Sequence, residues 1–206
     1  MMTPRTVLTV GHSAHSLDSF IALLAQHQVS AIADVRSTPF SRFTPQFNRE
    51  SVKQELARHK VGYAFLGREL GARSNDPNCY EDGRVQYARL AATKSFHEGI
   101  ERLRTGADRD RIALMCTEKD PLDCHRTLLV ARALHEEGVN VEHIHADGHL
   151  ETHEDAMLRL LDKFGLLQAN MFRTNDDLLH DALQQQEARI AYVDESLVPS
   201  AESVAR

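Results

Sequence analysis

The sequence contains no tryptophan, only six prolines and only three cysteines in 206 residues. Three cysteines are too few for a disulfide framework, and no export signal precedes the first apolar segment, so we expect reduced thiols and a cytoplasmic protein. No apolar run approaches the roughly 20 residues that a membrane-spanning helix needs, so we expect no membrane partner. Positive charge is also scarce, because 24 lysines and arginines are outnumbered by 30 aspartates and glutamates, for a net charge of −6. This balance disfavours a broad non-specific grip on nucleic acid, although it leaves room for a local basic patch.

The rest of the composition, 42% hydrophobic and 26% charged, is typical of a globular domain with one core. Short β-branched apolar runs alternate with longer helical patterns up to Phe164, which is typical of βαβ units. We therefore predict an α/β fold of three layers, with a mostly parallel sheet of about five strands and helices on both faces. This domain, residues 1–165, is followed by a helical extension, residues 166–206, with a frayed end. The extension is expected to pack either on the domain or on a second subunit of a homodimer.

The apolar periodicity places the elements along the chain. Strands are predicted at residues 6–10, 31–35, 62–66, 112–116 and 141–145. Helices are predicted at residues 17–26, 48–60, 85–104, 121–137, 153–164 and 176–190. Two long connections, residues 36–47 and 67–83, interrupt this rhythm, and connections of that length in a compact domain are often functional.

Polar residues of catalytic type follow the predicted strands. In an open parallel sheet, ligands bind in the crevice outside the carboxyl ends of the strands, so residues distant in sequence are expected to meet there. The residues at these strand ends are His12, Ser13, Asp34, Arg36, Arg68, Cys116 and Glu118.

The segment from Cys116 to Arg126 concentrates most of this chemistry. Cys116 is the last residue of a buried strand, so its side chain can point into the crevice. The Asp120-Pro121 pair is typical of a helix start, which places Cys124 in the first turns, on the stripe that faces the sheet. A nearby helix start would lower the pKa of Cys116 and the acidic neighbours would raise it, so the direction stays open.

These residues favour an enzyme in which Cys116 is a nucleophile or redox thiol. His12, Glu118 or His125 would then be its proton-transfer partners. A thiol phosphatase is excluded, because its arginine would stand six positions after the nucleophile, where this chain has Leu122.

The expected ligand is a small anion, phosphorylated or nucleotide-like. Arginines interleaved with phenylalanines in the connection 36–47 suit such a ligand, because guanidinium groups bind oxyanions and aromatic rings stack on bases. The same loop could serve a non-catalytic module that binds a nucleotide or nucleic acid, although no glycine-rich phosphate-binding motif occurs. The candidate ligand-binding residues are Ser13, Asp34, Arg36, Arg42, Arg68, Cys124 and Arg126.

A structural metal site is a further alternative. Cys116, Cys124 and His125, with a fourth ligand such as His153, offer the sulfur and nitrogen atoms that zinc prefers, but the Cys-x7-Cys spacing is not a standard zinc pattern. We therefore assign no metal ligand, and the sequence identifies no cofactor.

Several motifs occur in a fixed order: Thr9-Val10-Gly11-His12-Ser13, Asp34-Val35-Arg36, Leu66-Gly67-Arg68, Cys116-Thr117-Glu118 and Cys124-His125-Arg126. Over residues 5–164 this pattern resembles the DUF488 family of bacterial and archaeal proteins. The resemblance implies a small α/β domain and brings no established reaction or cofactor. Its motifs coincide with the strand-end residues, which favours one shared site.

Overall fold

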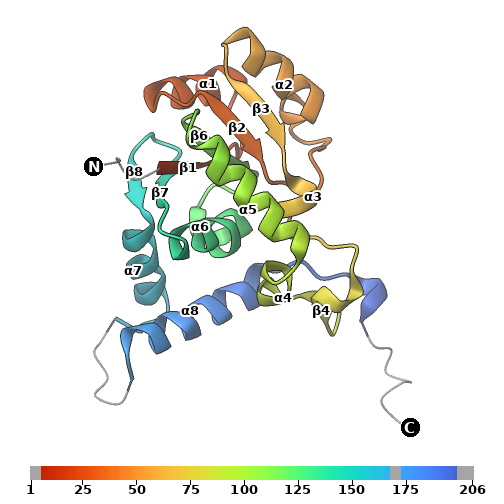
Figure 1. The fold of residues 1–206 in the computed structure, drawn as a ribbon, viewed down its shortest axis with the longest axis vertical. Coiled ribbons are helices and arrows are strands. Elements are labelled where there is room, and N and C mark those ends of the chain that lie inside the picture. Colours follow the sequence, from red (N-terminus) through yellow and green to blue (C-terminus); the bar gives the residue numbers. More distant parts are fainter. Residues whose placement is uncertain (1–5, 168–172, 199–206) are drawn as a thin grey trace.

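The computed structural model describes residues 6–167 and 173–198 of the chain and has an α/β fold around a six-stranded sheet (Figure 1). The strand order is β3-β2-β6-β1-β7-β8. The five predicted strands are confirmed and run parallel: β1 (Thr6–Gly11), β2 (Ala31–Asp34), β3 (Gly62–Phe65), β6 (Ile112–Cys116) and β7 (Asn140–Ile144). The sixth strand, β8 (Leu150–Thr152), pairs antiparallel with β7 at the edge. It was not predicted, because three residues are too few to display a periodicity.

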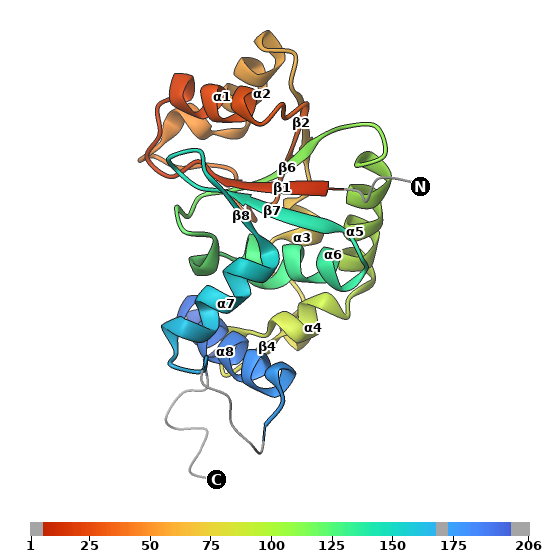
Figure 2. The ribbon, with the colours of Figure 1, turned by 90° about the vertical axis from the view of Figure 1, so that its left-hand side faces the viewer.

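Helices cover both faces of the sheet, as predicted (Figure 2). One face carries α1 (Leu17–Gln26) and α2 (Arg49–Arg58), and the other carries α5 (Lys94–Gly106), α6 (Arg132–Glu136) and α7 (His153–Lys163). Side chains of β1 alternate between the two cores: Leu8 and Val10 pack with Phe20 of α1, and Val7 belongs to the opposite core. Beyond this second helical layer lie α4 (Tyr87–Ala91) and α8 (Asn175–Ile190).

The predicted helix at 85–104 is not continuous. Its first residue belongs to a small hairpin of β4 (Tyr80–Glu81) and β5 (Arg84–Val85), and the remainder is divided between α4 and α5. Thr93 causes the break, because its side chain accepts a hydrogen bond from the Phe96 N–H and caps α5. The long connection 67–83 also contains α3 (Gly67–Leu70) and a 3-10 turn, Pro77–Cys79, which local periodicity had not indicated.

The predicted helix at 121–137 is also interrupted, at the residues that matter most for the site. A 3-10 turn, Pro121–Asp123, comes first, and Asp120 caps it by accepting from the Leu122 N–H. Cys124 is then extended, with φ −140° and ψ 139°. A π-helical segment, Arg126–Ala131, precedes α6. π-helical turns occur frequently at functional sites, and here the break presents Cys124 and its neighbour at the end of the sheet.

The C-terminal extension packs on the domain within the described residues. The buried side chain of Gln186 on α8 donates to the Leu122 carbonyl oxygen and to the Asp123 carboxylate, each at 2.9 Å. The helix therefore braces the turn that precedes Cys124. The predicted frayed end lies largely in residues 199–206, outside the described residues, and the domain boundary near 165 and the homodimer stay predictions. Among the helices that the structure describes, none combines the length and apolar character needed to cross a membrane.

Gly11 brings the end of β1 close to the loop that follows β6. The His12 N–H donates to the Cys116 carbonyl oxygen and the Ser13 N–H to that of Thr117, both at 2.9 Å, so the parallel pairing continues past the strands. A Cβ atom on Gly11 would lie 1.9 Å from the Glu118 carbonyl oxygen, a clash with backbone. Only glycine permits this approach.

We predict that Gly11→Ala lowers the free energy of unfolding by about 3 kcal/mol, because the added methyl group displaces the loop after β6. Urea unfolding followed by circular dichroism measures this change. Gly62→Ala is the matched control: its Cβ would meet its nearest atom at 3.5 Å, an ordinary contact. Equal losses in the two variants would show that the close approach at Gly11 does not constrain the loop.

Candidate active site

The candidate site lies beyond the carboxyl end of β6. This strand is flanked by β1 and β2, which lead into helices on one face of the sheet, whereas β6 leads into α6 on the other face (Figure 2). Such a reversal leaves a crevice at the strand ends. A cavity of about 220 Å³ is found there, and five residues predicted for the site line it: Arg36, Cys116, Glu118, Cys124 and His125.

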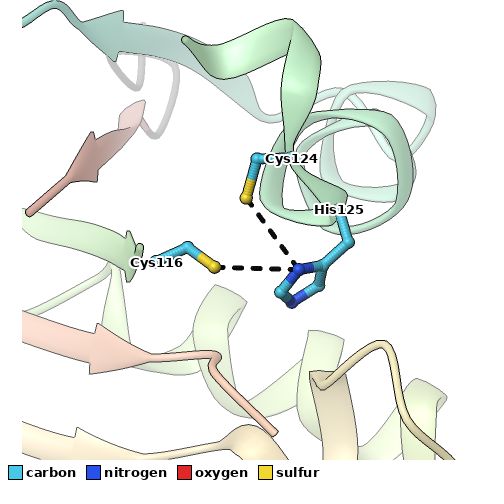
Figure 3. Close-up of side chains that lie close together, drawn as sticks. All are labelled: Cys116, Cys124 and His125. Carbon is cyan, nitrogen blue, oxygen red and sulfur yellow. Dashed lines mark hydrogen bonds between the residues drawn. The ribbon is translucent and has the colours of Figure 1, made fainter. Parts of the chain in front are cut away.

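Four of these side chains form a compact group, which we call the thiol cluster: Cys116, Glu118, Cys124 and His125. Each of the two sulfur atoms lies 3.0 Å from Glu118 Oε2. His125 Nδ1 lies 3.7 Å from the Cys116 sulfur and 3.9 Å from the Cys124 sulfur (Figure 3). Both cysteines are buried, whereas Glu118 comes from an exposed loop and turns its carboxylate inward.

The imidazole of His125 is oriented by a backbone carbonyl. Its Nε2 lies 3.0 Å from the Val35 carbonyl oxygen, which can only accept, so Nε2 carries a proton and donates. The other nitrogen, Nδ1, faces the two sulfur atoms. Burial opposes protonation, but the Cys124 sulfur and the Glu118 carboxylate outweigh it and raise the pKa of His125 above its ordinary value.

The two thiols differ in their surroundings. The contact with Cys124 and burial both raise the pKa of Cys116 well above its ordinary value. Burial acts in the same direction on Cys124, but the Cys116 thiol, the Arg126 guanidinium and His125 outweigh it and hold the pKa of Cys124 well below its ordinary value. The Arg126 backbone N–H also donates to the Cys124 sulfur at 3.4 Å. The surroundings therefore favour ionisation of Cys124 over that of Cys116.

Glu118 carries the acidic group of the cluster. Burial of the carboxylate and the negative charge of Cys124 raise its pKa. Its backbone is held by Arg126, which is fully buried and donates to the carbonyl oxygens of Glu118 at 2.8 Å and Lys119 at 3.4 Å. Arg126 does not line the cavity, and its guanidinium secures the loop that carries Glu118, so its ligand-binding role stays a prediction.

A second buried network lies beside the cluster, around Arg36. Asp34 accepts from Arg36 Nε at 2.9 Å and Nη2 at 2.6 Å, and it accepts from the Tyr63 hydroxyl at 2.7 Å. Arg36 Nη1 donates to His12 Nε2 at 3.2 Å. The Arg36 charge is thus largely neutralised at the inner wall of the cavity, and Asp34 has the structural role of orienting this arginine.

His12 contacts Arg36 and does not line the 220 Å³ cavity. Its ring stacks on Phe47 with centroids 4.3 Å apart, and its Nδ1 donates to the Ser13 carbonyl oxygen. Burial and the Arg36 charge lower the pKa of His12 to about 4. In this geometry a neutral His12 accepts from Arg36 and orients it, and the proton-transfer role stays a prediction.

Three further predicted residues do not line the 220 Å³ cavity. The side chain of Arg42 is exposed and lies over the Phe43 ring, 4.8 Å from its centroid, and it lines neither this cavity nor the adjoining one. Arg68 is exposed in the adjoining cavity. Ser13 has a positive φ of 43° and contributes its backbone to the extended pairing. The paths of the loops keep these side chains out of the cavity, and the number of residues after a strand does not predict such a path.

The adjoining cavity, of about 680 Å³, shares four lining residues with the first: Ser37, Thr38, Arg73 and Tyr192. None of them was predicted as a site residue. The length of the connection 67–83 was the available signal for Arg73. Tyr87 also lines the 220 Å³ cavity. Its place in a helical pattern gave no indication of a role in the site.

Within the described residues, one group could hold a metal ion: Cys116, Cys124 and His125, whose ligand atoms all lie within 4.8 Å of one another. The fourth ligand considered from sequence, His153, is not part of it. His153 Nδ1 instead lies 3.2 Å from His143 Nε2, in a buried pair on the far side of the sheet end.

These features define an α/β protein with a thiol, imidazole and carboxylate cluster at the carboxyl edge of a parallel sheet. The profile of the DUF488 family, described as a domain of unknown function, matches residues 16–133. The chain therefore belongs to the DUF488 family, as its motifs had indicated. No curated protein and no solved structure matches it.

We predict that acidification destabilises the protein in part through His12. Its pKa in the folded protein, about 4, lies below the ordinary value of 6.5, so unfolding binds a proton between these values and stability falls as the pH falls. The loss approaches about 1.4 kcal/mol per pH unit within this window. Urea unfolding of the wild type and of His12→Gln at pH 7, 6 and 5 measures it. A variant whose stability declines as steeply as the wild type would contradict the assignment.

Proposed function

We propose that this protein is an enzyme that uses the Cys124 thiolate as a nucleophile on a small ligand carrying an anionic group. The observation that carries the proposal is the meeting of two thiols, an imidazole and a carboxylate within 4 Å at the inner end of one cavity. A structural core needs no such set of groups, and reactive cysteines are typically paired with a histidine in this way.

The choice of Cys124 over Cys116 rests on what each sulfur touches. Cys124 accepts from the Arg126 backbone N–H and lies next to the Arg126 guanidinium, and both favour a negative sulfur. Cys116 then acts as the donor that supports the thiolate. The proposed nucleophile is thus Cys124, which the sequence placed among the ligand-binding residues, in place of Cys116, and both cysteines line the cavity.

A balanced reaction can be written with these groups. The Cys124 thiolate forms a bond to an electrophilic atom of the ligand, and the leaving group departs with the electron pair of the broken bond. The leaving group takes up a proton from Glu118, whose pKa is raised by burial and by Cys124. Water then cleaves the covalent intermediate, restores the thiolate and returns a proton to Glu118. The net change is hydrolysis, and His125 stabilises the negative sulfur before the attack and after the intermediate is cleaved.

The two adjoining cavities support a ligand with a reactive end and an anionic end. The inner cavity, at about 220 Å³, is smaller than the roughly 300 to 1,000 Å³ of drug-sized ligand sites, so it suits the reactive end alone. Arg73 stands where the cavities meet, with its guanidinium 4.4 Å from the Tyr192 ring centroid. In the described part of the chain Arg73 forms no ion pair with a carboxylate. It is therefore the arginine best placed to bind a phosphate or carboxylate group.

One observation favours the second candidate, a non-catalytic module for nucleotides or nucleic acid. Phe40 and Phe43 are 69% and 81% exposed, and the Arg42 guanidinium lies beside the Phe43 ring. Exposed aromatic and basic side chains of this kind stack on bases and contact phosphates. This loop lies apart from the thiol cluster, so the two candidates depend on different residues.

We expect iodoacetamide to modify Cys124 at least about ten-fold faster than Cys79, an equally buried cysteine outside the cluster. The measurement is peptide mapping by mass spectrometry of metal-free protein after timed alkylation. Cys124→Ser should abolish fast labelling, whereas Cys116→Ser, which keeps a hydroxyl donor, should retain it. Fast labelling of Cys116 in the Cys124→Ser variant would return the nucleophile role to Cys116.

Inorganic phosphate should slow this alkylation in the wild type, because an anion bound at Arg73 blocks the path to Cys124. We expect Arg73→Gln to lose the protection and Arg42→Gln, which removes the same charge elsewhere, to keep it. Sodium chloride at equal ionic strength is the control for screening. Loss of protection in Arg42→Gln alone would place the anion site in the exposed loop and favour the binding module.

A further inference from the structure

We propose that the thiol cluster binds one Zn²⁺ ion through the Cys116 sulfur, the Cys124 sulfur and His125 Nδ1, with Glu118 Oε2 at a fourth, exchangeable position. This inference concerns the same side chains as the proposed function but does not depend on its chemistry. The site then has a second state, in which both sulfur atoms coordinate the metal.

The distances already fit a tetrahedral zinc site. Zinc bonds of about 2.3 Å to sulfur and 2.0 Å to nitrogen place sulfur and nitrogen ligands about 3.5 Å apart in a tetrahedron. His125 Nδ1 lies 3.7 and 3.9 Å from the two sulfur atoms, and all three atoms lie within 4.8 Å of one another. The same geometry places two sulfur ligands about 3.8 Å apart and an oxygen ligand about 3.6 Å from each sulfur, so shifts of up to about 1 Å bring the four atoms into coordination.

The histidine is already oriented as a metal ligand. Zinc-binding histidines usually donate their other ring N–H to a carboxylate or backbone carbonyl, which fixes the ring and directs the ligand nitrogen at the metal. His125 Nε2 donates to the Val35 carbonyl oxygen at 3.0 Å. Val35 follows β2 directly, so the ring is anchored to a strand other than the one that carries Cys116.

The charges also balance when the metal is bound. Two thiolates cancel the charge of Zn²⁺, and Glu118 adds one negative charge. The Arg126 guanidinium is fully buried and donates to carbonyl oxygens, and among the described residues no carboxylate forms an ion pair with it. The loaded cluster would supply the negative charge that this buried cation lacks.

The ligand types select zinc over the common hard cations. Calcium and magnesium prefer oxygen ligands, whereas two sulfurs and an imidazole suit Zn²⁺. The Cys-x7-Cys spacing is unusual because the ligands come from a strand end and from a break between helical turns. Glu118 stands on an exposed loop at the cavity, so a ligand from the cavity could replace it, as in zinc sites with an open position.

Zinc and thiol reactivity exclude each other at this site. Metal binding removes the protons from the cluster and engages the Cys124 sulfur, which then cannot attack a ligand or an alkylating reagent. Zinc availability would thus regulate the activity that we propose for the metal-free protein.

Titration of the metal-free full chain with Co²⁺ tests the inference. Cobalt in a site with cysteine ligands gives sulfur-to-metal charge-transfer absorption and the visible bands of tetrahedral coordination. We expect both, saturating at one Co²⁺ per chain and abolished by excess Zn²⁺. Wild-type protein without these bands, or with octahedral cobalt only, would overturn the proposal.

Variants identify the ligands. Cys116→Ser, Cys124→Ser and His125→Gln should each weaken zinc binding at least about 100-fold, judged by competition with a chromophoric chelator. Cys79→Ser is the matched control and should bind as the wild type does. Glu118→Gln changes an exposed residue and should keep the charge-transfer band while weakening affinity less. If Cys79→Ser lost the band and Cys116→Ser retained it, the assignment would fail.

Alkylation separates this proposal from the proposed function. Zn²⁺ should protect Cys124 from iodoacetamide, and a chelator should restore labelling. If Cys124 reacts readily and no cobalt band forms, the zinc site is wrong and the thiol chemistry stands. If the band forms and metal-free Cys124 is inert, the zinc site stands and the nucleophile is wrong.

Discussion

The buried guanidinium of Arg126 holds the site together. Through its hydrogen bonds to the Glu118 and Lys119 carbonyl oxygens, it folds the loop after β6 back over the segment that carries Cys124. Because Arg126 follows Cys124 by only two residues, this contact fixes the separation between the Glu118 carboxylate and both sulfur atoms. Gly11 leaves the space in which the loop lies. The cluster therefore depends on a cation that never reaches the cavity.

The arginines of this protein divide according to their partners. Arg36 is committed to Asp34 and His12, and Arg126 to backbone carbonyls, so both organise the walls of the site. A buried guanidinium must be satisfied by fixed acceptors, because an unpaired buried charge is costly. Exposed arginines at the cavity mouth, above all Arg73, keep their donors for a ligand. Buried arginines thus stabilise the walls of the site, whereas exposed arginines are available to bind a ligand.

The two kinds of chemistry that we propose for the thiol cluster have one physical reason. A sulfur that is easily ionised beside an imidazole is both a good nucleophile and a good zinc ligand, since both roles need the thiolate. In the metal-free protein, protons shared among the sulfurs, Glu118 and His125 occupy the positions that a metal would take. Which state prevails depends on the competition between protons and metal for the same electron pairs.

The sequence by itself determined the parallel strands, the helices on both faces and the gathering of Cys116, Arg36 and the 124–126 segment at one edge. Apolar periodicity is local, and parallel strands place their carboxyl ends together whatever the loops do. The sequence could not determine the interruption before α6, the capping at Thr93 or the short strand β8. At these places neighbouring elements and single side-chain hydrogen bonds outweigh the intrinsic helix or strand propensity of the residues.

Only the tertiary structure decided which candidates share the cavity. Arg42 and Arg68 were predicted with Arg36 from their residue types, yet loop paths separate them, while Arg73 and Tyr192, 119 positions apart in sequence, meet at its mouth. It also shifted the pKa values of the two thiols in opposite directions, since the pKa of a buried cysteine depends on neighbours that burial brings together. The sequence identified the reactive side chains, and packing between distant segments determined which of them contact one another.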